Sequence, residues 1–359
     1  MLPSIFANYY AQDFSTFGIG VLSDAISCFV EEERNSSYEL EMEYPVTGKY
    51  YEYLKLKNII TARANYSNIA QPFRIYYISR PLRGVVTVHA RHLSYDLSGF
   101  IAYPFTASSL AEAMTILTSN QYTSYSGPFP FTISSDMTST ASMRNKLPQS
   151  VRSLMGGVRG SMLDVYGGEW SFNVKECSLL SARGQDRGVV IQYGKNLTAL
   201  QETEEDTMYH GIVPYYYNAD TEELVYYDRI STPGLFLWHR DMLLDLTEEF
   251  DSTPTQNELY AKAIDWQNKH DILAPSVNLK LNFIQIDKYL DRVDLCDTVT
   301  INYDDLGVST SAKCIRLKWN VLLNRPEEIE IGTPKLSIGD FFQRVTPEHY
   351  YVGSSGGGG

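Results

Sequence analysis

One stretch near the N-terminus alternates apolar and acidic residues without interruption, and it constrains the fold more than any other feature of the chain. It reads Tyr38, Glu39, Leu40, Glu41, Met42, Glu43 and Tyr44. Successive side chains of a β-strand point to opposite faces of its sheet. This period of two therefore predicts a strand that is buried on one face and solvated on the other. Pro45 and Gly48 follow as turn residues.

Similar patterns continue through the first hundred residues. Further strands are predicted at 57–64, 72–79 and 84–92, and in the last of these Val86, Val88 and Ala90 alternate with polar residues. Short strands separated by turn signals are typical of an antiparallel barrel or sandwich. We therefore expect this part of the chain to be an all-β unit.

The character of the sequence changes at Pro104. Thr106 is a candidate N-cap, with Phe105 and Leu110 as a hydrophobic staple, for a helix that ends near Asn120. A loop rich in Ser, Thr, Gly and Pro is predicted over 121–142. Two short helical segments, 149–155 and 160–166, each end at a pair of glycines.

Strand patterns return from Glu169 onward. One predicted hairpin pairs Trp170, Phe172 and Val174 with Val189, Ile191 and Tyr193 across a turn within 183–188. A second hairpin pairs 209–217 with 223–230.

The strongest helix signal is the capping box that starts at Thr253, with Pro254 at the first helical position. Its apolar face is formed by Leu259, Ala263 and Trp266.

The last folded part contains β-like segments at 278–287, 297–303, 310–319 and 327–331, with a link between two of them at 304–307. Residues 352–359 have the Gly/Ser composition of a flexible linker. We expect no internal repeat.

The overall charge argues against nucleic-acid binding. The 359 residues carry a formal net charge of −13 and contain no block of basic residues, whereas phosphate binding needs clustered Lys and Arg. Asp13, Gly18 and Asp24 interrupt the apolar positions near the N-terminus, so no secretory signal is predicted. No stretch approaches the ~20 apolar residues that cross a bilayer. A soluble protein made in the cytosol is therefore expected.

Four cysteines lie far apart, without the two close pairs of a zinc site. They are Cys28, Cys177, Cys296 and Cys314. Buried free thiols are expected.

Two acidic runs are the candidates for carboxylate chemistry. The first comprises Glu31, Glu32 and Glu33, and the second comprises Glu202, Glu204, Glu205 and Asp206. Acid–base catalysis needs one carboxyl group whose pKa is raised by burial, whereas adjacent acids are usually solvated surface. We expect neither run to be catalytic.

Two other patterns are weaker. His89 and His92 are three residues apart, which in a strand places them on opposite faces and argues against a shared metal. The segment Gly157 to Ser161 resembles a phosphate loop but lacks the following lysine, so helix termination is favoured. The sequence thus predicts no catalytic, cofactor-binding or metal-binding residues.

Three motifs between Gly156 and Leu200 carry a family resemblance. The first is Gly160-Ser161-x-Leu163-Asp164-x-Tyr166-Gly167-Gly168-Glu169, the second Arg183-Gly184-x-Asp186-x-Gly188, and the third Tyr193-Gly194-Lys195-Asn196-Leu197. In this order they resemble the phage minor structural protein family. That family includes the prophage tail endopeptidase and tail-associated lysin proteins of phages that infect Gram-positive bacteria. The strand at 38–45 and the region 304–332 are also similar to it.

The resemblance implies an α+β, strand-rich fold like the hub of a phage baseplate, with two small antiparallel β-barrels and two α+β units in each protomer. It divides the chain into a first β-barrel domain (1–103), an α+β domain (104–195), a hairpin-and-helix region that completes the first barrel and a second α+β unit (196–275), a second β-barrel domain (276–345) and a Gly/Ser-rich tail (346–359).

The resemblance also implies a function and partners. Three protomers are expected to form a ring at the virion tail tip that adapts the sixfold tail tube to the threefold tip. The implied partners are other copies of the chain, the distal tail protein ring, the tape measure protein, tail fibre or receptor-binding proteins, and the bacterial cell surface. Phage DNA would pass through the ring without specific binding, so we expect an acidic lumen.

Two other functions stay open. Family members often carry a lytic extension after the hub, so the chain could instead be the anchoring part of a cell-wall hydrolase. Its 27 tyrosines could bind a cell-surface saccharide by ring stacking. We expect a structural protein that is not itself an enzyme and uses no cofactor.

Overall fold

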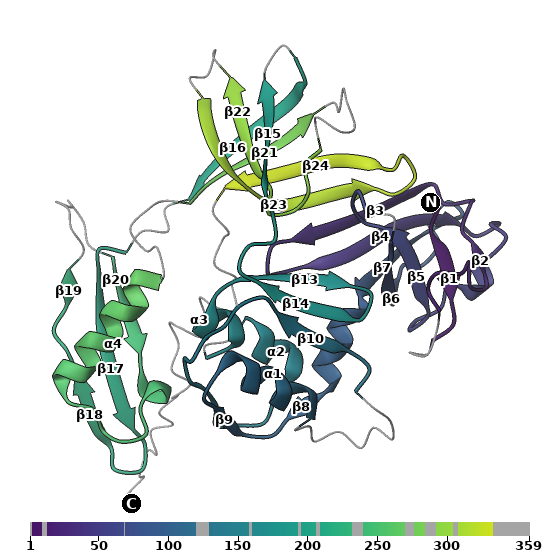
Figure 1. The fold of residues 1–359 in the computed structure, drawn as a ribbon. Coiled ribbons are helices and arrows are strands. Elements are labelled where there is room, and N and C mark those ends of the chain that lie inside the picture. The colour runs from purple at the N-terminus through teal and green to yellow at the C-terminus, as the bar shows by residue number, and fades with distance from the viewer. Residues whose placement is uncertain are drawn as a thin grey trace, which may run out of the picture. The chain divides into compact units, whose positions relative to one another are not determined.

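The computed structural model describes residues 2–8, 13–67, 69–119, 129–157, 160–192, 195–205, 209–231, 240–269, 276–283, 292–303 and 308–332. By its internal contacts the chain divides into two compact units. Unit 1 comprises residues 1–203 and 277–334, and unit 2 comprises residues 204–276 and 335–359. Figure 1 traces the elements of both.

Unit 1 is built on a sheet of thirteen strands. Its N-terminal part contains β1 (Ser4–Phe6), β2 (Gly20–Val21), β3 (Ser27–Glu33), β4 (Tyr38–Pro45), β5 (Ile59–Arg63), β6 (Ala70–Ile78) and β7 (Val85–His92). The spatial order is β3-β4-β7-β6-β5-β1-β2, and each neighbouring pair is antiparallel. The turn that follows β4 contains the short 3₁₀ helix η1 (Tyr51–Tyr53).

The alternating strand predicted from the sequence is β4. Its four apolar side chains are buried, and Glu41 and Glu43 between them are exposed. Tyr38 and Tyr44 are among the largest fully buried side chains of the chain. The apolar side of β4 therefore fixes which face of this sheet carries the core.

The C-terminal part of the same sheet contains β15 (Asp186–Gln192), β16 (Leu197–Glu205), β21 (Ser276–Phe283), β22 (Thr298–Tyr303), β23 (Val308–Asn320) and β24 (Arg325–Gly332). Strand β23 is long enough to pair with β22, β24 and β3. The two predicted barrel regions therefore share one hydrogen-bonded ladder, which Figure 1 shows at β23 and β3. Along the described strands the pairing path is open, and the two closed barrels stay a prediction. The predicted link at 304–307 and the tail lie outside the described residues.

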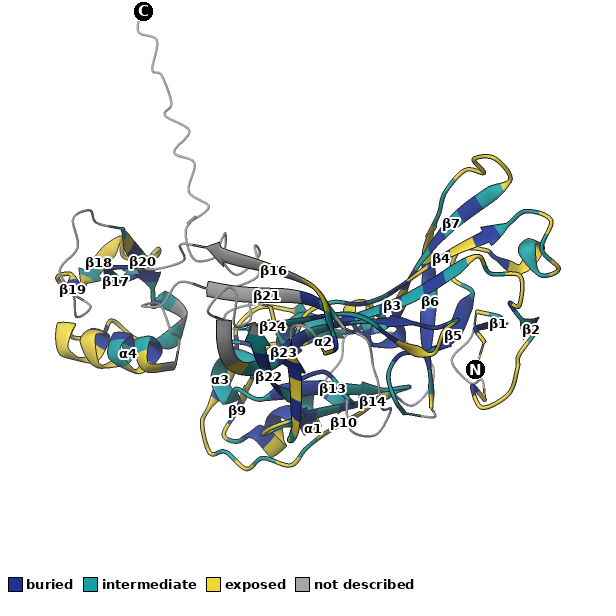
Figure 2. Ribbon diagram, turned by 90° about the horizontal axis from the view of Figure 1, so that it is seen from above, coloured by how far each residue is buried: buried dark blue, intermediate teal, exposed yellow. Residues whose placement is uncertain are grey.

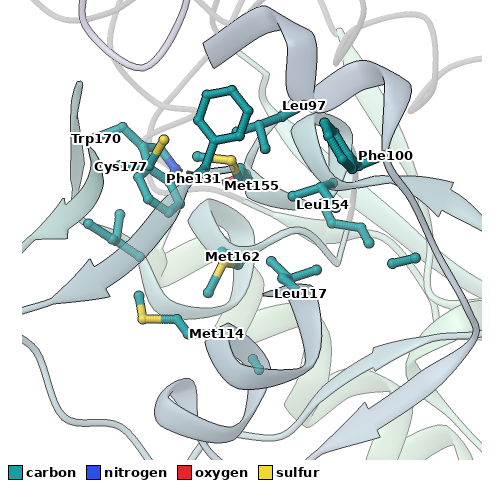
Figure 3. Close-up of a cluster of buried hydrophobic side chains, with 14 of the residues drawn as sticks. Leu97, Phe100, Met114, Leu117, Phe131, Leu154, Met155, Met162, Trp170 and Cys177 are labelled. Carbon is teal, nitrogen blue, oxygen red and sulfur yellow. Dashed lines mark hydrogen bonds between the residues drawn. The ribbon is translucent and has the colours of Figure 1, made fainter. Parts of the chain in front are cut away.

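The α+β part packs three helices against a small sheet. It contains η2 (Leu93–Gly99), α1 (Leu110–Ser119), α2 (Val151–Met155), α3 (Met162–Tyr166) and the strands β8 (Ile101–Ala102), β9 (Phe105–Ala107), β10 (Thr132–Ser135), β11 (Met143–Asn145), β12 (Gln149–Ser150), β13 (Glu169–Asn173) and β14 (Glu176–Leu180). Figure 3 shows its core, in which Met114 and Leu117 of α1 lie among Leu154, Met155 and other side chains of the surrounding elements. The two short helices end before the predicted glycine pairs, as expected.

Two local predictions in this region are wrong. Thr106 lies in strand β9, and α1 is capped instead by Ser109, whose hydroxyl accepts from the Glu112 backbone N–H at 3.2 Å. The predicted loop at 121–142 contains strand β10, which pairs in parallel with β14. Residues 120–128 lie outside the part of the chain that the structure describes.

The first predicted hairpin is also wrong. Strand β13 pairs with β14 across a tight turn, in which Val174 has a φ of 57°. Strand β15, the predicted partner, instead runs parallel to β22 in the large sheet. Burial alternates along β15 as predicted, but the partner of β15 is distant in sequence and no local signal identifies it.

Unit 2 is a small sheet covered by one helix. It contains β17 (Gly211–Asn218), β18 (Glu223–Tyr226), β19 (Ile230–Ser231), β20 (Asp241–Asp245), the 3₁₀ helix η3 (Thr247–Glu249) and α4 (Gln256–Lys269). The second predicted hairpin is confirmed, because β17 and β18 pair antiparallel across the turn after Asn218.

The best helix signal is confirmed, although its cap lies two residues later than predicted. Leu259, Ala263 and Trp266 of α4 are buried, as expected. The capping residue is Thr255, whose backbone N–H and hydroxyl both donate to the Glu258 carboxylate at 2.8 Å, and not Thr253. Pro254 consequently precedes the cap and does not occupy the first helical position.

Burial alternates along β4 and β7, as the colours of these strands in Figure 2 show. Among the described residues no helix is both long and apolar enough to span a bilayer.

Candidate functional site

A buried network of charged side chains in unit 1 is centred on Arg183. Its guanidinium binds the Glu32 carboxylate at two points, with Nη1 to Oε1 at 2.6 Å and Nη2 to Oε2 at 3.0 Å. Nη1 also donates to the carbonyl oxygen of Trp170 at 3.1 Å. The Glu32 side chain is only 3% exposed and that of Arg183 is 14% exposed. This is a buried, two-point ion pair between β3 and the segment that follows β14.

Burial is balanced by charge at this pair. Removing a guanidinium from water would by itself lower the pKa of Arg183, but the Glu32 carboxylate outweighs that effect and the pKa lies above its ordinary value. Arg183 is therefore a permanent cation at any pH at which the protein is folded. Because both side chains are largely buried and paired with each other, the pair holds β3 and the segment after β14 together.

Glu169 extends the network to β23. One carboxylate oxygen accepts from the Arg183 backbone N–H at 2.8 Å, and the other from Lys313 Nζ at 2.7 Å. Arg34 Nη1 lies 3.4 Å from the same carboxylate. Burial would raise the pKa of Glu169, but the Lys313 hydrogen bond and the other donors lower it below its usual value. Glu169 is thus an anion held by three different segments.

The turn between β3 and β4 is fastened to the same place. The Asn35 side chain donates to the Gly168 carbonyl at 3.0 Å and accepts from the Trp170 backbone N–H at 2.8 Å. Asn35 has a φ of 59°, a left-handed conformation that asparagine adopts more readily than most residues. Trp170 Nε1 in turn donates to the Met155 carbonyl at 3.0 Å. The Gly-Gly-Glu-Trp segment is therefore held by side-chain and backbone hydrogen bonds from two directions.

A second cluster surrounds Asp297, which is 2% exposed. Its carboxylate accepts from the Gln185 backbone N–H at 2.9 Å, from Arg187 Nε at 2.8 Å and from the Asp294 backbone N–H at 2.9 Å. Gly184 passes so close to this segment that an added Cβ would lie 2.0 Å from the Cys296 carbonyl. Only glycine fits there without a backbone shift.

The residues of the second motif, Arg183 to Gly188, make structural contacts. Arg183 pairs with Glu32, Gly184 allows the close approach to Cys296, and Asp186 accepts from the Gly188 backbone N–H at 2.8 Å. The motif links the α+β part to the C-terminal part of the sheet. It was predicted to be a hairpin turn, and that prediction is wrong because the chain goes on to pair with β22.

The third motif also has a structural role where it is described. Asn196 is 1% exposed, accepts from the Gln192 backbone N–H at 2.8 Å and donates to the Val190 carbonyl at 3.4 Å. It closes the end of β15. Tyr193 and Gly194 lie outside the described residues.

The first acidic run is not a uniformly solvated surface. Glu32 is buried in the pair with Arg183, whereas Glu31 and Glu33 point to the other face of β3 and are half-buried. Glu31 lies 3.6 Å from Arg316. In the second run, Glu202, Glu204 and Glu205 belong to β16, but their side chains, and Asp206 as a whole, lie outside the described residues.

His89 and His92 lie on opposite faces of β7, as predicted. His89 is half-buried near Glu41 at 3.6 Å, whereas His92 is 1% exposed and stacks on Tyr38 with ring centroids 4.6 Å apart. Burial, reinforced by the positive charges of Arg152 and Arg183, lowers the pKa of His92 to about 3. Within the described part of the chain, no group of three or more His, Cys, Asp or Glu side chains is placed to hold a metal ion.

The segment that resembles a phosphate loop ends one helix and begins another. Gly157 and Gly160 have φ values of 94° and 73°, and the Gly160 backbone N–H donates to the Asp164 carboxylate at 2.8 Å. The start of α3 is therefore already occupied by an anion of its own chain. Val158 and Arg159 lie outside the described residues.

All four cysteines are free and buried, which confirms the expectation from their spacing. Burial raises the pKa of the Cys177 and Cys296 thiols to about 12 in both cases. These groups are therefore packing residues with little thiolate at neutral pH.

Sequence reasoning missed the ion-pair network altogether. The sequence offers one signal. Glu32 is a charged residue on the same face of β3 as Cys28 and Val30, which are buried. A buried charge in a strand calls for a cation elsewhere in the chain, but the pattern does not say which.

Comparison with known proteins gives a likeness in fold. No protein-family model matches the chain, and no curated protein matches it in sequence. Among solved structures, prophage tail protein gp18 from Listeria monocytogenes EGD-e has a TM-score of 0.59 at 15% identity, over 96% of this chain and 98% of that one. The 43 kDa tail protein of prophage MuSo2 from Shewanella oneidensis also has a TM-score of 0.59, at 12% identity, over 85% and 93%. A tail protein from Neisseria meningitidis MC58 has a TM-score of 0.57 at 8% identity, over 93% and 97%.

This chain has the fold of phage tail proteins. The matches extend over nearly the whole of both chains, so the likeness covers the order of the parts as well as a single domain. At these levels of sequence identity the likeness shows the fold and does not show activity or partners.

Proposed function

We propose that the chain is a structural tail-tip protein of a tailed bacteriophage, a baseplate hub. The observation that carries the proposal is the end-to-end match with prophage tail protein gp18, which spans 96% of this chain and 98% of that one. The proposed location is the virion tail tip, reached after synthesis in the bacterial cytoplasm.

In this proposal three copies form a closed ring that joins the sixfold tail tube and distal tail ring to a threefold tip. Each protomer would contribute two small barrels to the ring. Further proposed partners are the tape measure protein, tail fibre or receptor-binding proteins and the bacterial surface. The DNA would pass through an acidic lumen that repels phosphate. A lumen lined by Lys and Arg in a structure of the assembled ring would contradict that part of the proposal.

The buried network of Arg183, Glu32 and Glu169 supports a structural role rather than a catalytic one. The motifs that resemble the phage family contain Arg183, Gly184 and Glu169, and all three are engaged in contacts between segments of unit 1. Their hydrogen-bond and ion-pair partners are groups of the chain itself, which supports a structural role for these residues. The protein is therefore proposed to be structural and not an enzyme.

One observation favours a second candidate, binding of a cell-surface saccharide. Tyr76 and Tyr77 on the outer face of β6 are 42% and 50% exposed, and aromatic rings of this kind stack on sugars. Saturable binding of purified host glycan, lost on Tyr77→Ala, would favour this candidate. Clearing of a peptidoglycan gel that disappears in Glu204→Gln or Glu205→Gln would instead favour the anchoring part of a hydrolase.

The solution mass of the purified chain tests the hub proposal. One protomer is 40.7 kDa, so a closed trimer weighs about 122 kDa and should elute as one sharp peak in size exclusion with light scattering. The measurement is repeated with the neighbouring tail-ring protein present. A chain that stays monomeric in both cases contradicts the ring.

A further inference from the structure

The charge of the chain is very unevenly distributed. Residues 204–276, in unit 2, contain 15 acidic and four basic residues, a net charge of −11 out of −13 for the whole chain. Residues 46–92, in the N-terminal part of the sheet, contain eight basic residues and one acidic residue. A protein with one strongly acidic and one strongly basic region is self-complementary between copies.

The basic residues gather at one end of the N-terminal sheet. The turn after β4 is hydrogen-bonded to the β6–β7 turn, from the Val46 backbone N–H to the Gly84 carbonyl at 2.9 Å. The segment before β5 is bonded to β6, from the Lys57 backbone N–H to the Ile75 carbonyl at 2.8 Å. These bonds bring together five exposed cations, Lys49, Lys55, Lys57, Arg80 and Arg83. We call this group, with the apolar side chains among it, the basic end.

The apolar side chains of the basic end are unusually exposed. Leu82 at the tip of the β6–β7 turn is 76% exposed, Leu56 is 59% exposed and Tyr77 is 50% exposed. Large apolar side chains surrounded by charges of one sign are typical of protein–protein contacts.

Unit 2 has a matching surface on the side of its sheet away from α4. On β17 the side chains of Ile212 and Tyr216 pack with α4, so Val213, Tyr215 and Tyr217 point to the opposite side. The register places Leu243 beside Val213, Tyr226 beside Tyr215, and Leu224 beside Tyr217. We call these six residues the aromatic face.

The aromatic face is open and has an acidic border. Leu224, Tyr226 and Leu243 are 55%, 52% and 53% exposed. Asp220 and Glu222 are exposed in the turn between β17 and β18, and Asp241 and Asp245 flank Leu243 on β20. An apolar sheet face bordered by acids suits an apolar partner bordered by cations.

We propose that the basic end of one copy docks on the aromatic face of the next copy. The inference rests on the proposed ring and deepens it by naming the two surfaces that join the subunits. The two surfaces are different, so the contact is head-to-tail, and each copy offers one of each kind. Such a contact forms a ring when the rotation between copies closes, here after three.

Two variants test the contact by solution mass. Lys55→Glu with Arg80→Glu reverses the charge of the basic end, and Leu224→Ser with Tyr226→Ser removes apolar side chains of the aromatic face; all four residues are exposed. Each variant should be monomeric at concentrations at which the wild type is a trimer, a weakening of assembly by about tenfold or more. The matched control, Lys195→Glu with Arg325→Glu, reverses two exposed cations outside both surfaces and should still form the trimer. Circular dichroism shows that each variant is folded.

A mixture of the two variants gives the sharper result. Each retains one intact surface, so a head-to-tail contact allows one copy of each to join and then stops. The expected product is a dimer of about 81 kDa, twice the protomer mass of 40.7 kDa. A contact in which both copies use the same surface gives no such dimer.

The outcomes separate this inference from the proposed function. A wild-type trimer that persists in both folded variants overturns the contact and leaves the hub intact. Loss of the trimer only in the control variant would likewise overturn the contact and leave the hub intact. A wild type that is monomeric with and without its tail-ring neighbour overturns the ring itself.

Discussion

Arg183 and Glu32 are 151 positions apart in the sequence, yet their side chains meet in a two-point ion pair with N–O distances of 2.6 and 3.0 Å. The pair ties strand β3 to the segment that leaves the α+β part for the C-terminal strands. Its environment makes it sensitive, because a charge that loses its partner inside a protein stays desolvated without compensation.

We therefore expect Glu32→Gln or Arg183→Met to lower the free energy of unfolding by about 3–5 kcal/mol. Replacing both residues, as Glu32→Leu with Arg183→Met, should recover much of that loss because no unpaired charge remains. Urea denaturation followed by circular dichroism measures both effects. The matched control is Arg91→Met, which breaks the more exposed pair with Glu39 and should change stability by no more than about 1 kcal/mol. Equal effects of the two Arg→Met variants would mean that burial does not govern this pair.

The periodicity of strands and helices could be predicted from the sequence, whereas the pairing of Arg183 with Glu32 could not. The alternation in β4 and the apolar face of α4 were predictable, because strand and helix periods are written in consecutive residues. The cap at Thr255 was missed by two positions, since Thr253 and Thr255 both begin plausible capping boxes.

Partners that are distant in sequence were not predictable. The pattern of β15 shows that it is a strand, but its parallel pairing with β22 depends on the intervening chain. Arg183 and Gly184 were predicted to lie in a turn, because the glycines within 183–188 permit a positive φ. Their contacts with Glu32 and Cys296 come from tertiary structure alone.

Gly184 provides a second test. A Cβ at this position would lie 2.0 Å from backbone atoms of Cys296, and backbone cannot rotate away as a side chain can. Gly184→Ala should therefore destabilise unit 1 by at least about 2 kcal/mol, in the range of core overpacking. Gly99→Ala is the control, because nothing lies within 4 Å of an added Cβ there, and it should be nearly neutral. Thermal melts of the two variants compare them directly. A wild-type melting temperature for Gly184→Ala would show that the approach to Cys296 is looser than described.

The buried thiols predict a pattern of reactivity. Cys28, Cys177, Cys296 and Cys314 are buried and free, and burial raises the pKa of each thiol well above its ordinary value. Because the thiolate is the reactive form, Ellman's reagent should modify none of the four at pH 8 in the folded protein and all of them in guanidinium. Fast labelling of one cysteine in the native protein would place that residue at a site of local opening.

The last prediction concerns acid and His92. Its pKa falls from 6.5 to about 3 because the imidazole is buried, with the positive charges of Arg152 and Arg183 adding to the effect. In the unfolded chain the imidazole takes up a proton below about pH 6.5, whereas in the folded protein it stays neutral until about pH 3. Its contribution to stability is therefore fully present above pH 6.5 and is lost progressively as the pH falls toward 3. At pH 5 the loss should be about 2 kcal/mol relative to pH 7.5.

A variant isolates this effect from the titration of carboxylates. His92→Phe keeps an aromatic ring against Tyr38 and removes the titrating group, so its stability should fall less between pH 7.5 and pH 5, by about 2 kcal/mol, than that of the wild type. The absolute stability of the variant does not enter, since only the difference between the two pH values is compared. If His92→Phe keeps the wild-type slope, the imidazole of His92 is accessible to protons in the folded protein, and acid sensitivity must come from other groups.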